Sequence, residues 1–213
     1  EKQTPYDLIV AAETNNQGAI NRLIDGGLDV NALVEIGEKD NQGQPIRTTA
    51  LVEAVIYNQE AAVRLLLDRG ADPSLAASDG VTPLMVAAEG DSLPQLTLLI
   101  DAKAALHAVE PEAGFTAFHF ACFDGNADCA EALVRAGCDT SLRDKSGMTG
   151  RDRAQSKGHT AVLERLAALG EMGLNREKTE HKRRSPEPVK QTKTKSRDQM
   201  TVMDGATSSK KEK

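Results

Sequence analysis

Cysteine and histidine are the residues of this chain best suited to metal binding or nucleophilic chemistry. Cys122, Cys129 and Cys138 lie within 17 residues, and His119 stands three positions before Cys122. A zinc site needs about four such ligands, usually as closely spaced pairs, and the sequence has no second pair. Three cysteines also make a poor disulfide framework. We therefore expect no metal site, small buried thiols and a reducing compartment: cytoplasm, nucleus, or an organelle if a targeting segment was removed.

Other groups that could serve in catalysis are scattered along the chain. The four histidines stand at positions 107, 119, 159 and 181. The sequence contains neither a glycine-rich phosphate loop nor a GxSxG nucleophile elbow. Carboxylates are numerous, but no two are expected in one dry pocket, which acid–base catalysis requires. The sequence predicts no catalytic residue, no cofactor and no enzyme activity, although an accessory region of a longer enzyme stays an open alternative.

Charge and composition restrict the partners. Residues 1–170 hold 14 basic and 25 acidic residues, a net charge of −11, whereas residues 171–213 hold 12 and 7, a net charge of +5. The acidic part would repel phosphates, so nucleic-acid binding by it is disfavoured. Aromatic residues make up only 3% of the chain, which favours thin layers of Leu, Ala, Val and Ile over one deep core. No apolar stretch is long enough for a membrane-spanning helix.

An internal repeat sets the positions of these residues. Segments that begin with Thr49, Thr82, Thr116 and Thr149 follow one another at intervals of 33 or 34 residues. Each leads into a second apolar run that, in most copies, ends near a glycine. A threonine can cap the first helix, and a glycine with positive φ can end the second. Neither short helix is stable alone, so stacked copies must bury each other's apolar faces as a solenoid.

This pattern resembles the ankyrin-repeat family, because the period, the Thr-Pro-Leu of Thr82–Leu84, the paired alanines and the Gly-Ala-Asp of Gly70–Asp72 agree in phase. The resemblance implies an all-α solenoid of about five helix pairs with hairpin fingers over residues 1–170, followed by a disordered basic tail over 171–213. In the third copy Lys103 replaces the usual glycine, so the helix end should be weaker there. The copies are expected at about 1–31, 45–77, 78–110, 112–143 and 145–170, with a loop insertion at 32–48.

The insertion is interpreted as a lengthened hairpin finger, because Gly37, Gly43 and Pro45 suit an extended loop. One interpretation is a tolerated surface insertion, since added loop length costs little. The other is a finger that contacts a partner. The sequence leaves both open.

The family resemblance implies a binding surface on the concave side of the stack, lined by the fingers and by exposed positions of each first helix. Tyr57, Glu89 and Phe123 are expected at equivalent positions of different copies. Alternatively, Phe115 and Phe123 fold back onto neighbouring copies as core. The expected partner-binding residues are Ile56, Tyr57, Val81, Glu89, Asp91, Phe115, Phe123, Asp124 and Met148.

These observations predict a protein-interaction scaffold, either a monomer or a subunit of a complex. The expected partner is a polypeptide segment with apolar and basic residues, because apolar groups and an acidic rim share the predicted surface. The alternative is a permanently embedded structural subunit of a large assembly.

Two residues are candidate modification sites. The spacing of Asn31 from Leu23 and Asp29 resembles ankyrin sites that an asparaginyl hydroxylase modifies, although Asn31 is also suited simply to close a turn. Ser185 precedes a proline and follows the basic cluster Lys182–Arg184. That cluster suits nuclear import, proline-directed phosphorylation at Ser185, or merely a solvated tail.

Deletion of residues 175–213 should leave the melting temperature of the repeat region unchanged. The segment has too little apolar surface to offset the entropy cost of ordering it. Thermal unfolding of the full and shortened chains measures this. A clear drop in melting temperature on deletion would instead show that the basic segment docks on the acidic region.

Overall fold

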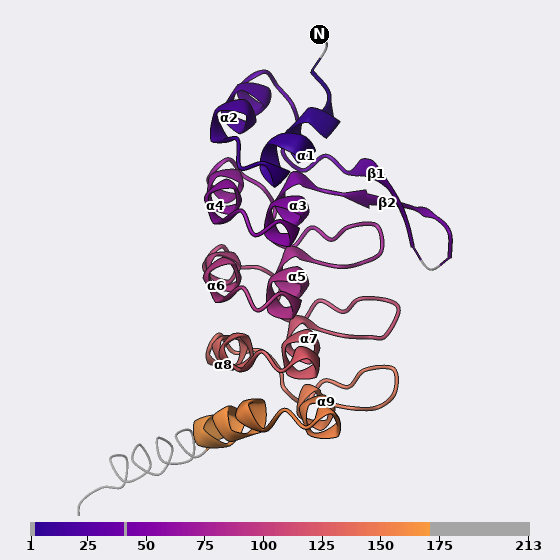
Figure 1. Ribbon diagram of the computed structural model, residues 1–213, viewed down its shortest axis with the longest axis vertical. Helices are drawn as coiled ribbons and strands as arrows, with labels where there is room; N and C mark the ends of the chain where they lie inside the picture. Colours follow the sequence, from indigo (N-terminus) through magenta and orange to yellow (C-terminus); the bar gives the residue numbers. More distant parts are fainter. Residues whose placement is uncertain (1–2, 41, 171–213) are drawn as a thin grey trace, which may run out of the picture. The chain divides into compact units, whose positions relative to one another are not determined.

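The described part of the chain, residues 3–40 and 42–170 of the computed structural model, is a succession of short helix pairs (Figure 1). The first helices are α1 (Pro5–Glu13), α3 (Ala50–Ile56), α5 (Pro83–Glu89), α7 (Ala117–Asp124) and α9 (Gly150–Lys157). The second helices are α2 (Gln17–Asp25), α4 (Glu60–Asp68), α6 (Leu93–Asp101), α8 (Ala127–Arg135) and a helical stretch over 160–170.

Each helix packs on its counterpart in the next pair. First helices contact first helices from α1 to α9, and second helices contact second helices from α2 to α8. Arg165 in the last helical stretch forms ion pairs with Asp128 and Glu131 of α8. The prediction of an all-α solenoid is therefore confirmed. The predicted tail over 171–213 lies outside the described residues.

Threonine side chains begin the first helices, as the repeat predicts. The Oγ1 atoms of Thr49, Thr82, Thr116 and Thr149 each accept a hydrogen bond from the backbone N–H three residues later, at 3.2–3.4 Å. Each bond satisfies an amide that has no partner within its helix. The capping threonines thus fix where each first helix starts and hence which residues it exposes.

The turns after the helices need left-handed backbone. Between the first and second helix of each pair, that residue is Asn15, Asn58, Asp91, Gly125 or Gly158. After the second helix it is Gly27, Gly70, Lys103 or Gly137. Lys103 has a φ of +68°, although a side chain on a left-handed residue is unfavourable. The third copy therefore has the same turn geometry as the others, but with backbone strain at Lys103.

Stacking of the first helices depends on small side chains. Every first helix has at least one completely buried alanine: Ala12, Ala54, Ala87 and Ala88, Ala121, and Ala154. At the last interface, a Cβ added to Gly150 would lie only 2.7 Å from the Phe118 ring, so glycine is required there. The second helices supply larger apolar groups such as Leu66 and Leu133. The core is therefore a thin continuous layer, in keeping with the low aromatic content.

Side-chain hydrogen bonds, here called polar brackets, join the turns after the second helices of successive copies. Asn31 Oδ1 accepts a hydrogen bond from the Asp72 backbone N–H at 2.8 Å, and Asn31 Nδ2 donates to the Gly70 carbonyl at 3.3 Å. In the next copies, the Ser74 hydroxyl and His107 Nε2 accept similar bonds from backbone amides of the following copy, both at 2.9 Å. These brackets fix the spacing of neighbouring copies at this edge.

The insertion forms a two-stranded antiparallel hairpin that projects further than the other loops (Figure 1). Strand β1 (Val34–Lys39) pairs with β2 (Pro45–Thr48), with Val34 opposite Thr48. Asp40 Oδ1 accepts hydrogen bonds from the backbone N–H groups of Gln42 and Gln44 at 2.9 and 2.8 Å. This hairpin is the lengthened finger that the insertion predicts, and it begins beside α1.

Replacement of Lys103 by glycine should stabilise the protein by about 1 kcal/mol, because glycine adopts the left-handed turn without steric cost. Urea unfolding of both proteins measures the difference. The matched control is Gly70→Ala at the equivalent turn, where an added Cβ meets no other atom. That control should lose stability by a similar amount through backbone strain alone. A less stable Lys103→Gly variant would contradict the account.

Candidate functional site

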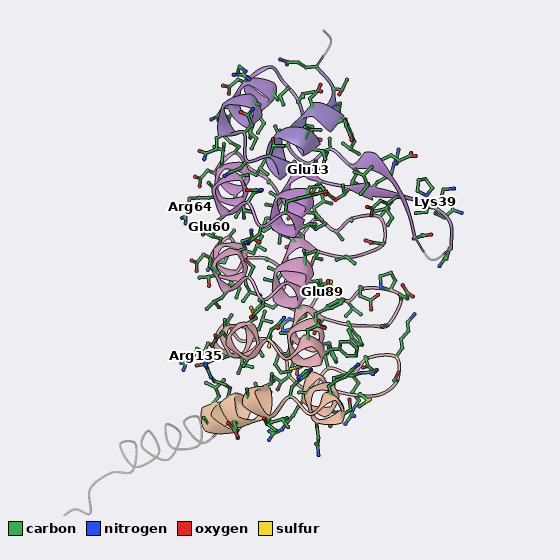
Figure 2. All side chains as sticks on the ribbon, in the orientation of Figure 1. Glu13, Lys39, Glu60, Arg64, Glu89 and Arg135 are labelled. Atoms are coloured by element: carbon green, nitrogen blue, oxygen red, sulfur yellow. The ribbon has the colours of Figure 1, made fainter. Side chains whose placement is uncertain are left out.

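The first helices and the fingers share one face, here called the inner face, whereas the second helices form the outer face (Figures 1 and 2). Figure 2 shows Glu13 and Glu89 on the first-helix column, and Glu60 and Arg64 on the second-helix column.

The nine predicted partner-binding residues differ in how much of each is exposed to solvent. Ile56, Tyr57, Glu89, Asp91 and Asp124 are exposed, Val81, Phe123 and Met148 are half-buried, and Phe115 is buried.

The predicted equivalence of Tyr57 with Phe123 is wrong by one residue. Asn58, Asp91 and Gly125 all adopt the left-handed conformation and so define the same position in their copies. Counting back two residues from each places Ile56, Glu89 and Phe123 in one row. Tyr57 belongs to the next row, together with Asp124.

The exposure predicted for Phe115 is also wrong. Only 8% of this residue is exposed, because its ring packs on the rings of His119, Phe120 and Phe123 with centroids 5.3–5.7 Å apart. The Arg153 guanidinium carbon lies 5.2 Å from the Phe115 centroid. The alternative interpretation, that this ring folds back onto its neighbours, is therefore correct for Phe115.

Phe123 is only partly available, because Lys157 Nζ lies 4.1 Å above its ring centroid. Such cation–π contacts satisfy the face of an aromatic ring from within the protein. At the C-terminal end of the inner face, aromatic rings and basic side chains therefore already have intramolecular partners.

A buried ion pair holds Arg153 in this aromatic group. Arg153 Nε donates to Asp144 Oδ2 at 2.6 Å, and the Asp144 side chain is completely buried. Burial alone would raise the pKa of Asp144, but Arg153 and the backbone N–H groups of Met148 and Ser146 outweigh it and lower this pKa below its usual value. Arg153 is therefore a structural clamp between the last finger and Phe115.

Two carboxylates in the middle of the inner face, Glu89 and Asp124, are close enough to repel each other. Partial burial raises the pKa of Glu89, and repulsion from the Asp124 carboxylate raises it further. Burial likewise raises the pKa of Asp124, while His159 and Lys157 act in the opposite direction. This part of the inner face therefore carries two neighbouring acidic groups with raised pKa values.

A second acidic group lies at the N-terminal end, where the long hairpin joins the stack. We call it the Glu53 cluster: Tyr6, Glu13, Glu38, Glu53 and Tyr57. Burial raises the pKa of Glu53, and the Glu13 and Glu38 carboxylates add to this, whereas the nearby Thr48 side chain acts in the opposite direction. Repulsion from Glu13, then from Glu53 and Glu38, raises the pKa of the exposed Tyr57 phenol.

Sequence reasoning missed Glu53, although its position in the repeat was a signal. The equivalent residues in other copies are Val10, Val86 and Phe120, with Arg153 in the last. A glutamate in a row that is mostly apolar is unexpected, because buried carboxylates are rare unless paired. The structure places Glu53 at 4% exposure.

The histidines of the stack hold neighbouring copies together. Buried His119 contacts the Thr116 hydroxyl through Nδ1 at 2.9 Å and the Met148 carbonyl through Nε2 at 3.3 Å. His159 Nε2 lies 2.9 Å from the Phe123 carbonyl oxygen. Both histidines therefore have a structural role in joining neighbouring copies.

The three cysteines are free thiols, and burial raises the pKa of Cys122, Cys129 and Cys138 to about 12. Within residues 3–40 and 42–170, no group of three His, Cys, Asp or Glu side chains is placed to hold a metal ion. No helix in the same residues is long and apolar enough to cross a membrane.

The two candidate modification sites stay predictions. Asn31 is half-buried and its amide is engaged with the next copy, as described above. Its backbone N–H also bonds to Asp29 Oδ1 at 2.9 Å, which is the turn-closing role weighed against modification. Ser185 lies outside the described residues.

Comparison with known families gives one match. The family model described as ankyrin repeats in three copies matches residues 8–110 and residues 84–178. The two matches overlap and together span all five helix pairs of the described stack.

Three curated relatives are longer proteins that this chain matches over part of their length. Ankyrin repeat and SAM domain-containing protein 6 of Mus musculus is 33% identical over 54% of this chain and 13% of its own length. Mitochondrial disaggregase of Bos taurus is 27% identical over 84% of this chain and 25% of its own length. Palmitoyltransferase AKR1 of Lachancea kluyveri is 28% identical over 75% of this chain and 21% of its own length. The chain thus spans a quarter or less of each of these relatives.

Replacing Asp144 by asparagine should destabilise the protein by about 2–3 kcal/mol at pH 7, because it leaves Arg153 without its buried partner. Since the folded-state pKa of Asp144 lies below its unfolded value, the stabilisation is complete above about pH 5 and is lost as the pH falls through the folded-state pKa. Urea unfolding at several pH values measures this difference.

Asp128→Asn is the matched control, because Asp128 pairs with Arg165 on the exposed outer face. It should change the free energy of unfolding by less than about 1 kcal/mol. If Asp144→Asn and Asp128→Asn behaved alike at pH 7, Arg153 would not be the clamp described here.

Proposed function

This chain belongs to the ankyrin-repeat family, and we propose that it is a protein-interaction module that holds a segment of a partner polypeptide on its inner face. Ankyrin repeats generally mediate protein–protein interaction. The observation that carries the proposal is the concentration of exposed apolar groups on the two N-terminal first helices. These are Tyr6, Val10, Ile56 and Tyr57, with exposed fractions of 50, 39, 52 and 53%.

Such a concentration is characteristic of an interface. Exposed large apolar residues are ordinary when scattered, but a group on one surface marks a binding site. Tyr57 has two further properties of interface anchors, since it is rigid and carries a polar tip. The C-terminal end of the inner face has less exposed apolar surface, because Phe115 is buried and the Phe123 ring lies under Lys157.

The charges favour a partner segment with basic residues as well as apolar ones. Glu13, Glu38 and Glu53 lie close enough to Tyr57 to raise the pKa of its phenol, and Glu89 and Asp124 add acidic groups further along the stack. Opposite charge on a partner speeds encounter and fixes its register. The hairpin β1–β2 stands beside this surface, and we propose that it contributes contacts.

We infer that the chain itself is a non-catalytic region. Thiols with pKa values near 12 are poor nucleophiles at neutral pH, and the nitrogens of His119 and His159 hold neighbouring copies together. A reducing compartment accords with three free cysteines. A second candidate is an accessory region of a longer enzyme, because two longer relatives are a disaggregase and a palmitoyltransferase by name.

Tyr57→Ala should weaken binding by about 30-fold or more, the usual effect of truncating an anchoring aromatic. The ligand for this measurement is a peptide that the full chain selects from a random library displayed on phage. Fluorescence anisotropy gives the affinity and thermal unfolding the stability. Because Tyr57 is exposed, the free energy of unfolding should change by less than about 0.5 kcal/mol.

Leu93→Ala is the matched control, since Leu93 is another exposed large apolar residue but lies on the outer helix α6. It should bind the peptide as tightly as the unchanged chain. Equal losses for the two variants, or a loss for Leu93→Ala alone, would move the binding surface away from the inner face.

A further inference from the structure

Glu53 is a buried carboxylate that the fold leaves incompletely paired. Only 4% of the residue is exposed, and its Oε1 has no hydrogen-bond partner among the described residues. The Thr48 side chain, at the end of β2, is the hydrogen-bonding neighbour that lowers the pKa of Glu53, so the hydroxyl and the carboxylate lie beside each other. A hydroxyl carries no compensating charge, and buried carboxylates are rare unless they are paired with a cation.

The acidic neighbours of Glu53 make its ionised form less favourable at this position. Glu13 at the end of α1 and Glu38 in β1 both repel its negative charge. No basic side chain of residues 3–40 or 42–170 forms an ion pair with it, although seven such contacts occur elsewhere in that part of the chain. A buried charge without a partner is strongly unfavourable. Burial and the two carboxylates raise the pKa of Glu53, and a cation placed beside it would instead favour its charged form.

The cluster does not have the geometry of a metal site. The three carboxylates of the cluster come from different elements, and they are not among the groups placed to hold a metal, of which the described residues contain none. A cation at the end of a long flexible stem suits the arrangement better. Lysine and arginine have such stems, which lie along apolar surface while the charged head reaches a polar partner.

The rim of the cluster matches such a stem. Tyr6, Ile56 and Tyr57 are all at least half exposed and belong to α1 and to the end of α3. Tyrosine rings bind ammonium and guanidinium groups through their faces, and the Ile56 side chain offers apolar contact. In the last copy, Arg153 occupies the row of Glu53 and lies over a ring, so the fold already uses this kind of contact.

We propose that Glu53 is the specificity determinant of the inner face and receives one lysine or arginine side chain from an extended segment of the partner polypeptide. The Glu53 carboxylate turns toward the inserted cation, Glu13 and Glu38 complete its neutralisation, and Tyr6, Ile56 and Tyr57 cover its stem. This inference rests on the proposed function and names the partner residue that the surface selects.

The test is peptide selection by the full chain and by its Glu53→Gln variant from a random phage library. Peptides of about 12 residues, roughly 40 Å when extended, are long enough to cross several copies. The unchanged chain should select peptides in which apolar residues surround one lysine or arginine. Glu53→Gln should keep the apolar preference and lose the basic one. Glu60→Gln, an exposed glutamate of α4 on the outer face (Figure 2), is the control and should select as the unchanged chain does.

A double-mutant cycle then isolates the contact. In one selected peptide, norleucine replaces the basic residue, which removes the charge and keeps an apolar stem. The unchanged chain should lose about 30-fold in affinity, because a buried charge is left unpaired. Glu53→Gln should lose less than about threefold. Equal losses in the two proteins would overturn the assignment of Glu53.

The stability of Glu53→Gln provides an independent check. Its melting temperature should equal or exceed that of the unchanged chain, because the change removes an uncompensated buried charge. If the variant does not fold, the exposed Glu38→Gln replaces it in the cycle. Glu38→Gln should then show a smaller coupling of the same sign, and no coupling would contradict the proposal.

The outcomes separate this inference from the proposed function. If the unchanged chain selects no peptides, the proposed function fails with it. If it selects peptides without a basic preference, only the Glu53 assignment fails. A third result is possible with a variant in which Lys182, Arg183 and Arg184 are changed to glutamine. If this variant selects peptides and the unchanged chain does not, the chain's own basic segment occupies the site. That result would contradict a partner's side chain as the natural ligand.

Discussion

The close stacking of alanine-bearing first helices is the contact on which the rest of this structure depends. Each of the five helices has at least one fully buried alanine, and at Gly150 of α9 even an added Cβ would lie too close to the Phe118 ring of α7. Because the helices approach so closely, each exposes the same narrow set of positions to the inner face. The capping threonines and the left-handed turns then keep those positions in register from one copy to the next.

A shared scaffold makes the differences along one row informative. The row that contains Glu53 reads Val10, Glu53, Val86, Phe120 and Arg153 from the N-terminal copy to the C-terminal one. At the C-terminal end Arg153 is bound by Asp144 and covers Phe115, so its charge and the ring satisfy each other. At the N-terminal end Glu53 has no basic partner in the described stack, and the aromatic groups beside it are exposed. One end of the inner face is therefore closed by internal contacts, whereas the other retains a buried carboxylate that has no ion pair in the described stack.

The sequence was sufficient for the repeat architecture because the repeat is local. Thr82, Gly70 and Gly137 mark helix starts and ends through hydrogen bonds and backbone conformations that depend on a few neighbouring residues. Exposure on the inner face was harder to predict, because it depends on contacts between copies. Phe115 is buried by rings from α7 and by Arg153 of the last copy. No short sequence pattern predicts this contact between copies. Glu53 was missed because it was read as one acidic residue among many, rather than as a charge in an apolar row.

The central claim, that a partner segment lies along the N-terminal half of the inner face, is tested most directly by hydrogen–deuterium exchange of the full chain. Exchange is compared with and without a saturating peptide selected by that chain, and bound ligand slows exchange where it restricts local opening. The account predicts slower exchange in the ends of α1 and α3 and in the hairpin β1–β2, with α4, α6 and α8 unchanged. Protection confined to the outer helices, or to α7 and α9, would contradict it.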